Sequence, residues 1–187
     1  MSGKLYLKNL IPAIFVNLMG MLALALFLFA NGNQFQTVLF MHRAVADNKY
    51  LLRQSNMTIT IDDIENRVYT DDKWVRFILN QIIGNAIKYR IEQPVLHFSA
   101  IKTNDRVVLS VSDNGIGIPK SDLPRIFEKG FTGRNGRIGK NSTGMGLYLC
   151  KRLCDKLGIG LTAHSESKGT TIALSFQMND FIIRVQG

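Results

Sequence analysis

Two short motifs in the second half of the chain combine residue types that suit nucleotide chemistry. In the first, Asp113–Ile118 (DNGIGI), a carboxylate ends a strand-like run and precedes two glycines. That carboxylate can accept a hydrogen bond from the exocyclic amine of a purine, and glycines let the backbone approach the ring. The alternative is an ordinary Asn-Gly hairpin turn, but Pro119 cuts short the return strand that a hairpin needs.

The second motif, Ser142–Leu147 (STGMGL), follows a basic loop at residues 129–141. Gly144 and Gly146 are predicted to open a helix, whose free N–H groups and dipole favour phosphate. The loop carries four basic residues and no acid, which by itself usually marks only a solvated segment. Its place just before the helix favours a cationic flap over a polyphosphate.

A third set of polar residues lies on the helix predicted at Asp71–Tyr89, with Thr70 as its N-cap. This helix is mostly apolar, yet Gln81, Asn85 and Lys88 fall on one file of it. These side chains either bond each other or a neighbouring loop, or they line a ligand cavity; the helix alone leaves both open. In a cavity, the Asn85 amide oxygen suits Mg²⁺ and Lys88 suits phosphate.

The composition limits the partners and the compartment. The chain has 187 residues and a formal net charge of +9, which favours phosphorylated ligands, anionic lipid or nucleic acid. No zinc-finger spacing or RNP-like motif is present, so nucleic acid is not an expected partner. The two cysteines, Cys150 and Cys154, lie one helical turn apart and are interpreted as small apolar core residues.

The N-terminal part of the chain is predicted to anchor it in a membrane. Leu10–Ala30 is almost entirely apolar and has about the 20 residues that a bilayer requires, without a clean signal-peptide cleavage site. Lys4 and Lys8 favour a cytoplasmic N-terminus. We therefore divide the chain into a basic N-terminus and transmembrane helix (1–30), a polar, partly helical connector (31–56) and an α/β catalytic unit (57–187).

Residue periodicity predicts an α+β fold in which helices cover one face of a mixed or antiparallel sheet. Besides the helix at Asp71–Tyr89, the predicted elements are a short helix at Ser121–Phe127, a helix at Thr143–Leu157 ended by Gly158, and strands at Met57–Ile61, Val95–Lys102, Arg106–Ser112, Ile159–Ser165 and Thr170–Gln177.

Taken together, the motifs resemble the Bergerat-type ATP-binding fold of the GHKL superfamily, a two-layer α/β sandwich, and specifically a sensor histidine kinase. The resemblance covers roughly residues 57–178. Gln81–Tyr89 resembles the N box, Asp113–Ile118 the G1 box, Phe127–Phe131 the F box and Gly144–Leu147 the G2 box, while Gly169-Thr170 resembles a last, weaker glycine motif.

The resemblance implies an ATP site with Mg²⁺. Asn85 would hold the metal, Lys88 would contact phosphate, Tyr89 would pack on adenine and Asp113 would recognise its amine. Gly115, Gly117, Gly144 and Gly146 would frame a lid, with Arg134 and Arg137 reaching the γ-phosphate. The remaining implied ATP-binding residues are Phe131, Thr143, Met145, Leu147 and Thr170.

Two further stretches narrow the resemblance. Tyr69–Trp74 and Lys129–Arg137 look like the small intramembrane-sensing kinases that answer bacitracin and antimicrobial peptides. Those kinases sit in the cell membrane with a cytoplasmic catalytic domain, as homodimers, beside an ABC transporter and a response regulator. The resemblance implies the same membrane placement and partners here.

One position indicates the type of reaction. The ATPases of this superfamily place a water-activating glutamate four residues before the metal-binding asparagine. This chain has Gln81 there, which cannot act as a general base, so transfer to another nucleophile is favoured over hydrolysis.

No histidine of this chain fits the phosphoacceptor pattern. His97 and His164 lie in predicted strands, and His42 has no acid beside it and no proline after it. We therefore expect the dimerisation hairpin to be missing, with an internal deletion that joins the first membrane helix to the catalytic domain near residues 31–35. The alternatives are a non-catalytic nucleotide-binding module and an anti-sigma-type serine kinase.

Overall fold

The computed structural model describes residues 34–62, 67–133, 143–166 and 168–178 of the chain. The predicted membrane helix at 10–30 lies outside these ranges, and so do Arg134 and Arg137. Within the described ranges, no helix is both long and apolar enough to cross a bilayer.

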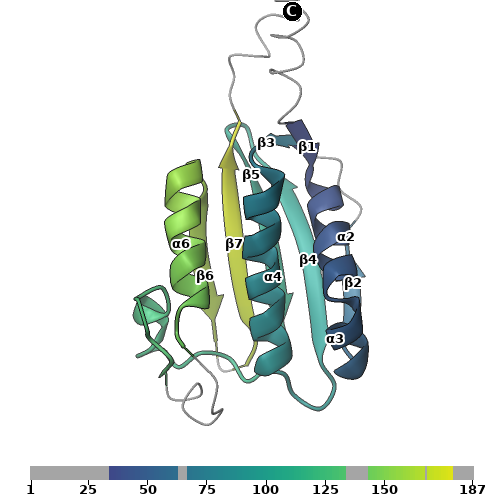
Figure 1. Cartoon of the computed structure of the whole chain (residues 1–187), viewed down its shortest axis with the longest axis vertical. Helices are drawn as coiled ribbons and strands as arrows, with labels where there is room; N and C mark the ends of the chain where they lie inside the picture. Colours follow the sequence, from purple (N-terminus) through teal and green to yellow (C-terminus); the bar gives the residue numbers. More distant parts are fainter. Residues whose placement is uncertain (1–33, 63–66, 134–142, 167, 179–187) are drawn as a thin grey trace, which may run out of the picture. The chain divides into compact units, whose positions relative to one another are not determined.

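A five-stranded mixed sheet forms one layer of the domain (Figure 1). Its order is β2-β4-β5-β7-β6, and only β2 and β4 run parallel. The strands are β2 (Thr58–Ile61), β4 (Val95–Lys102), β5 (Arg106–Asp113), β7 (Thr170–Gln177) and β6 (Gly160–Ser165). All five predicted strands are therefore present, with ends that differ by one residue at most.

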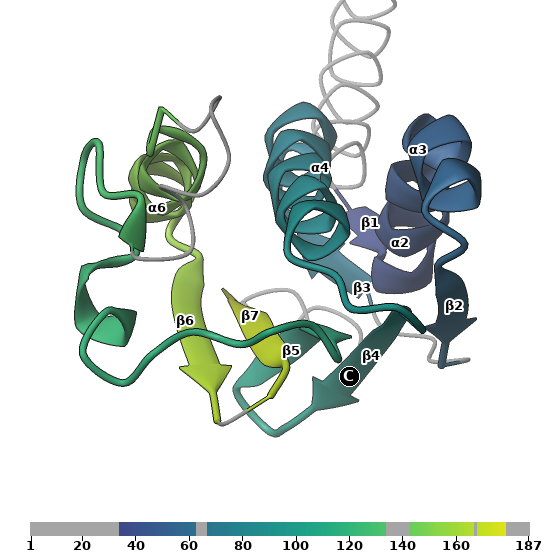
Figure 2. The ribbon, with the colours of Figure 1, turned by 90° about the horizontal axis from the view of Figure 1, so that it is seen from below.

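Helices cover one face of this sheet, as Figure 2 shows from below. Helix α4 (Asp72–Lys88) lies between α6 (Gly146–Leu157) on one side and α2 (Thr37–Asp47) with α3 (Lys49–Gln54) on the other. The predicted two-layer α+β arrangement is confirmed.

Two smaller elements complete the described part of the chain. Strand β1 (Gln34–Gln36) pairs with β3 (Arg67–Tyr69) in a separate two-stranded sheet. The helix predicted at 121–127 is only a 3₁₀ turn, η1 (Leu123–Arg125).

Strand alternation explains where the core ends. On β5, Val107, Leu109 and Val111 all point into the core and are buried. Because side chains on one face recur every second residue, Asp113 is the next to point inward. It is paired with Leu96 on β4 and Thr170 on β7. The apolar layer thus gives way to polar side chains at this end of the sheet.

The start of α4 corrects one prediction. Asp71, not Thr70, is the N-cap: its carboxylate accepts hydrogen bonds from the backbone N–H groups of Lys73 (2.9 Å) and Trp74 (3.3 Å). Asp71 has the extended backbone that a cap requires, and its charge suits the helix dipole. The Thr70 hydroxyl is instead buried without a hydrogen-bond partner among the described residues.

Helix α6 starts later than predicted and ends where predicted. It begins at Gly146 rather than Thr143 because Gly144 has φ +65°, which an α-helix cannot contain. Gly158 ends it with φ 68°. The interpretation of Cys150 and Cys154 as core residues is confirmed: both are fully buried, and burial raises the pKa of the Cys150 thiol to about 12 and that of Cys154 to about 11.

Helices α2 and α3 fall within the stretch predicted to be a polar connector at 31–56. On α2, Phe40, Met41 and Ala44 are buried and belong to the hydrophobic core. Their spacing places them on one helical face, which packs against α4. The described helices of the connector, at residues 37–54, are therefore structurally part of the sandwich.

Candidate functional site

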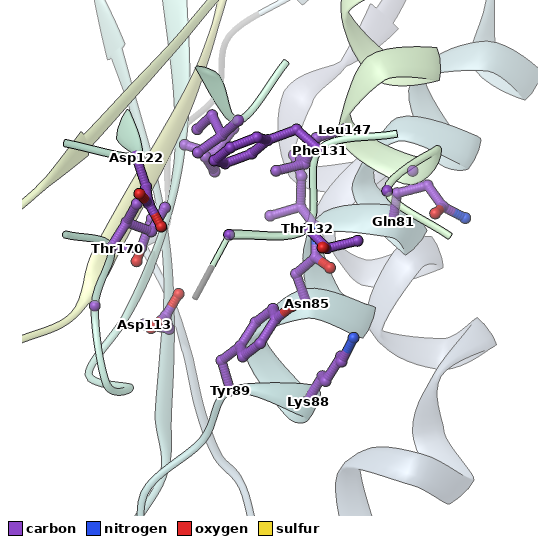
Figure 3. A pocket seen from close by; sticks show the side chains of 18 of the residues that line it. Gln81, Asn85, Lys88, Tyr89, Asp113, Asp122, Phe131, Thr132, Leu147 and Thr170 are labelled. Carbon is purple, nitrogen blue, oxygen red and sulfur yellow. The ribbon is translucent and has the colours of Figure 1, made fainter. Parts of the chain in front are cut away.

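A cavity of about 300 Å³ lies where α4, the polar end of the sheet and the start of α6 meet (Figure 3). Most of the residues predicted to bind ATP line it. Gly115 and Met145 do not, and Arg134 and Arg137 lie outside the described residues. The predicted residues in the lining are Asn85, Lys88, Tyr89, Asp113, Gly117, Phe131, Thr143, Gly144, Gly146, Leu147 and Thr170.

Helix α4 supplies one wall through Gln81, Asn85 and Lys88, the polar file that the sequence indicated. None of these three side chains has a hydrogen bond to another residue in the described part of the chain. That resolves the question left open by the helix alone, because the file faces a cavity instead of a protein partner. The Lys88 ammonium lies 5.0 Å from the ring centroid of Tyr89. The Tyr89 ring lies at the lower end of this wall in Figure 3.

The sheet supplies the opposite wall, where Asp113 and Thr170 stand side by side at the ends of β5 and β7. One Asp113 oxygen accepts a hydrogen bond from the Gly115 N–H at 2.8 Å. Burial raises the pKa of the Asp113 carboxyl, and the backbone N–H groups of Gly115 and Thr170 only partly oppose this shift. A half-buried acceptor of this kind suits a neutral donor such as an amine.

The chain after Asp113 does not form the hairpin considered as an alternative, because β5 pairs with β4 and β7. It turns toward the end of α4 instead, where the Ile116 N–H donates to the Tyr89 carbonyl at 3.1 Å. A Cβ at Gly115 would lie 2.6 Å from that same carbonyl oxygen, so only glycine fits. Gly115 therefore shapes the site without lining it.

The third wall is the start of α6. Its N-cap residue, Met145, makes no side-chain cap bond, so the first N–H groups of the helix remain available to an anion. The Gly130 N–H donates to the Gly144 carbonyl at 3.1 Å and ties this entry to the segment that contains Phe131. A Cβ at Gly146 would lie 2.7 Å from Gln81 Oε1, so the Gln81 amide packs against the first residue of the helix.

These walls fit a ligand with an amine at one end and negative charge at the other. Residues 70–180 match the model of a family described as histidine kinase-, DNA gyrase B- and HSP90-like ATPases. The chain belongs to this family. The nucleotide of the domain is accordingly ATP.

Several named relatives that this chain resembles are sensor histidine kinases. The sensor protein kinase GraS of Staphylococcus aureus (strain MRSA252) is 45% identical over 121 residues, which cover 64% of this chain and 35% of GraS. The sensor histidine kinase YxdK of Bacillus subtilis (strain 168) is 40% identical over 114 residues, covering 60% of this chain and 35% of YxdK. The chain thus spans about a third of the length of these relatives.

Solved structures agree on the fold. A mycobacterial sensor histidine kinase, MprB, superposes with a TM-score of 0.67 at 18% identity over 77% of this chain and 97% of that one. The histidine kinase ThkA, solved in complex with the response regulator TrrA, gives a TM-score of 0.64 at 17% identity over 92% of this chain and 52% of that one. At this identity the likeness concerns the fold alone.

The sequence missed several residues of this ATPase-domain cavity. Ile172 and Ile82 were detectable as inward positions of a strand and a helix. The loop residues gave no periodic signal, because their placement depends on how the chain folds back after β5. The missed lining residues are Ile82, Ile118, Pro119, Asp122, Ile126, Thr132, Gly133 and Ile172.

The described residues of the cavity could give a magnesium ion one protein ligand, the side-chain amide oxygen of Asn85. Asn85 offers an amide oxygen to the cavity, a ligand type that Mg²⁺ accepts. Within the described ranges, no group of three or more His, Cys, Asp or Glu residues could hold a metal. An ion here would therefore take most of its ligands from the triphosphate and water, as Mg²⁺ commonly does with nucleotides.

Proposed function

We propose that this domain binds Mg-ATP and passes the γ-phosphoryl group to a histidine, as the ATP-binding catalytic part of a two-component membrane sensor histidine kinase. The observation that carries the proposal is the cavity itself. It holds a half-buried acceptor carboxylate at Asp113, an uncapped helix N-terminus at Gly146, and the Asn85 and Lys88 side chains on the wall between.

In this proposal each wall binds one part of ATP. Asp113 accepts from the adenine amine, and Tyr89 packs on the base. Lys88 and the start of α6 neutralise the phosphates, and Asn85 would hold a Mg²⁺ ion that supplies further positive charge there. Magnesium would supply charge neutralisation at the transferring group; the contribution of the chain is positioning and electrostatics.

The absence of a base at position 81 supports transfer over hydrolysis. Gln81 lines the cavity four residues before Asn85, but an amide cannot take a proton from water. We therefore propose that bound ATP is hydrolysed slowly and reacts mainly with an imidazole nucleophile.

That imidazole is supplied by another segment or a partner. His97 lies on β4 with its Nε2 2.9 Å from Asp62, and His164 lies on β6 with its Nε2 3.5 Å from Glu166. His42 is exposed on α2. None of the three is among the residues that line the cavity.

The remaining partners follow from the relatives and from the antibiotic-kinase motifs. We propose a response regulator as the receiver of the phosphoryl group, a homodimer as the active form of the intact kinase, and an ABC transporter as a neighbour in the cell membrane. The sensor-kinase names of the relatives and the structure of ThkA with TrrA support the response regulator as a partner. The homodimer and the ABC transporter are proposed from the antibiotic-kinase motifs alone. The division at residues 30 and 56 and the internal deletion near residues 31–35 remain proposals.

Binding is tested by titrating the chain with ATP, with and without Mg²⁺, in a calorimeter. We expect saturable binding that strengthens with Mg²⁺. Absence of both heat and thermal stabilisation at millimolar ATP would remove the proposal.

Transfer is tested by adding the isolated dimerisation domain of a related kinase together with γ-labelled ATP. Acid-labile label on that domain is the expected result and indicates phosphohistidine. Tight ATP binding without any label would favour a passive nucleotide-binding module, and acid-stable label on an added protein would favour a serine kinase.

A further inference from the structure

The polar end of the sheet contains a buried serine that the proposed function does not use. Ser165 is the last residue of β6, and it pairs with Thr170 on β7, which in turn pairs with Asp113 on β5. Residues paired across antiparallel strands point to the same face of a sheet, so the three side chains form one row. Asp113 and Thr170 line the cavity, whereas Ser165 is 6% exposed and does not. Ser165 can therefore influence a bound nucleotide only through its neighbours.

The Ser165 hydroxyl connects two segments that lie far apart in the sequence. It accepts a hydrogen bond from the Ile118 N–H at 2.8 Å, and it donates to the Gly169 carbonyl at 2.6 Å. Ile118 belongs to the loop that follows Asp113, and Gly169 directly precedes Thr170. One side chain thus holds the loop after β5 and the turn before β7.

The loop and the turn also contact each other, with little free space around the serine. The Gly169 N–H donates to the Gly115 carbonyl at 2.8 Å. A Cβ at Gly117 would lie 3.2 Å from Ser165 Oγ, so the backbone of the loop lies close to the serine. Gly117 and Ile118 themselves line the cavity, on the side of Asp113. Ser165 therefore supports the part of the wall that we assign to adenine.

We propose that Ser165 is a positioning residue for the adenine end of the ATP site, because its hydroxyl holds the Gly115–Ile118 loop in the place in which the cavity fits the base. The inference rests on the proposed ATP-binding function and adds to it a residue that does not touch the nucleotide. The hydrogen bonds of Ser165 go to the loop after β5 and the turn before β7, whereas the phosphate end is built from α4 and the start of α6. Loss of the hydroxyl should therefore weaken the binding of the base and leave the binding of phosphate unchanged.

The test measures the dissociation constants of Mg-ATP and of inorganic tripolyphosphate for the wild-type chain and for Ser165→Ala. The substitution leaves the Ile118 N–H and the Gly169 carbonyl without this partner, so the loop should occupy its binding position for only part of the time. The apparent affinity falls with the fraction of competent molecules, and we expect ATP to bind about tenfold more weakly. Tripolyphosphate should bind as it does to the wild type. Hydrogen exchange at the Ile118 amide should become faster.

A matched control removes a serine hydroxyl from the opposite face of the same sheet. The Ser112 and Thr171 hydroxyls lie 2.9 Å apart on β5 and β7, next to Asp113 and Thr170. Successive side chains of a strand point to opposite faces, so Ser112 points away from the cavity. Ser112→Ala should leave the affinity for both ligands unchanged. If it weakened ATP as much as Ser165→Ala does, the proposal would be wrong.

The outcomes separate this inference from the function on which it rests. A wild-type chain that does not bind ATP removes the proposed function itself. ATP binding by the wild type with unchanged affinity in Ser165→Ala, or with equal losses for ATP and tripolyphosphate, overturns the role of Ser165 and leaves the ATP site standing. Should Ser165→Ala fail to fold, Ser165→Cys decides, since a thiol has a similar shape and makes weaker hydrogen bonds. Its affinity for ATP should fall severalfold, and an unchanged ATP affinity overturns the proposal.

Discussion

Helix α4 presents polar side chains on two sides. Those toward α2 have partners in the protein, whereas those toward α6 face a cavity. Toward α2, Asp72 pairs with Arg43 at 2.9 Å, and Asn80 accepts a hydrogen bond from Asn48 at 2.8 Å. Between them, Arg76 pairs with Asp47. Toward α6, Gln81, Asn85 and Lys88 find no such hydrogen-bond partners among the described residues and face a cavity. The paired side chains hold the helices together, while the side chains that face the cavity are available to a ligand.

The carboxylates on the two sides show the same contrast. The hydrogen bond from Arg76 is the main reason that the pKa of Asp47 lies below its ordinary value. Burial is the main reason that the pKa of Asp113 lies above it. The protein stabilises the charged form of Asp47 through its partner, whereas Asp113 in the cavity is available to a hydrogen-bond donor of a ligand.

The largest expected effect comes from placing a charge on the cavity side. Asn85→Asp puts a carboxylate where we propose the phosphates and the metal to bind, and like charges in contact cost several kcal/mol. We expect Mg-ATP to bind about a hundredfold more weakly, measured by calorimetry.

The same substitution on the other side of α4 is the control. Asn80→Asp still accepts from Asn48 but places a second acid beside Asp47. We expect a small loss of thermal stability with unchanged ATP affinity. If both variants lost ATP equally, the distinction between the two sides would be wrong.

An effect of similar size, on folding stability instead of ATP affinity, concerns the backbone that supports Asp113. Gly169 has φ +76°, and a Cβ there would lie 2.5 Å from the Asp113 carbonyl oxygen. Gly169→Ala should therefore destabilise the domain by about 3 kcal/mol, combining left-handed strain with a backbone clash. Gly158→Ala has φ +68° and no atom within 4 Å, so urea unfolding should show a loss of only about 1 kcal/mol. Equal losses would mean that the clash is relieved by movement of the loop.

Asp113→Asn should weaken the binding of the adenine and leave the binding of the phosphates unchanged. We expect about tenfold weaker binding of ATP, because a charge-assisted hydrogen bond becomes a neutral one, and unchanged binding of inorganic tripolyphosphate. Competition against a fluorescent nucleotide measures both. A similar loss of affinity for ATP and for tripolyphosphate would show that Asp113 does not contact the adenine.

The raised pKa of Asp113 also gives a dependence on pH. Without ATP, the folded protein binds the Asp113 proton more tightly than the unfolded chain does. Protonation of this carboxyl therefore adds to the folding stability of the domain at low pH. That contribution is lost as pH rises from the ordinary value of 3.8 through the raised one, whereas ATP affinity should increase over the same window. Asp113→Asn should abolish both changes.

The smallest effect is expected on the α2 side. Arg43→Ala removes a partly exposed ion pair with Asp72, which is worth about 0–1 kcal/mol. We expect a slightly lower melting temperature and the same ATP affinity. A clear loss of ATP binding would show that α2 contributes to the site through α4.

Much of the site was predictable because its residues follow local periodicity. Gln81, Asn85 and Lys88 share a helical file whatever the helix packs against, and Asp113 continues the inward positions of β5. Thr70 was wrongly chosen as the cap because the sequence offered adjacent residues of suitable type. Asp122 was missed because a loop residue carries no period.

The sequence by itself determined the five strands of the main sheet, the helices α4 and α6, the polar file and the family, since these depend on residue spacing within short segments. Only the tertiary structure decided which side of α4 is closed by α2 and which faces a cavity. It also decided that 37–54 belongs to the sandwich and that Asp122 joins Asp113 in one pocket. These are contacts between segments far apart in the chain, and local residue preferences do not encode them.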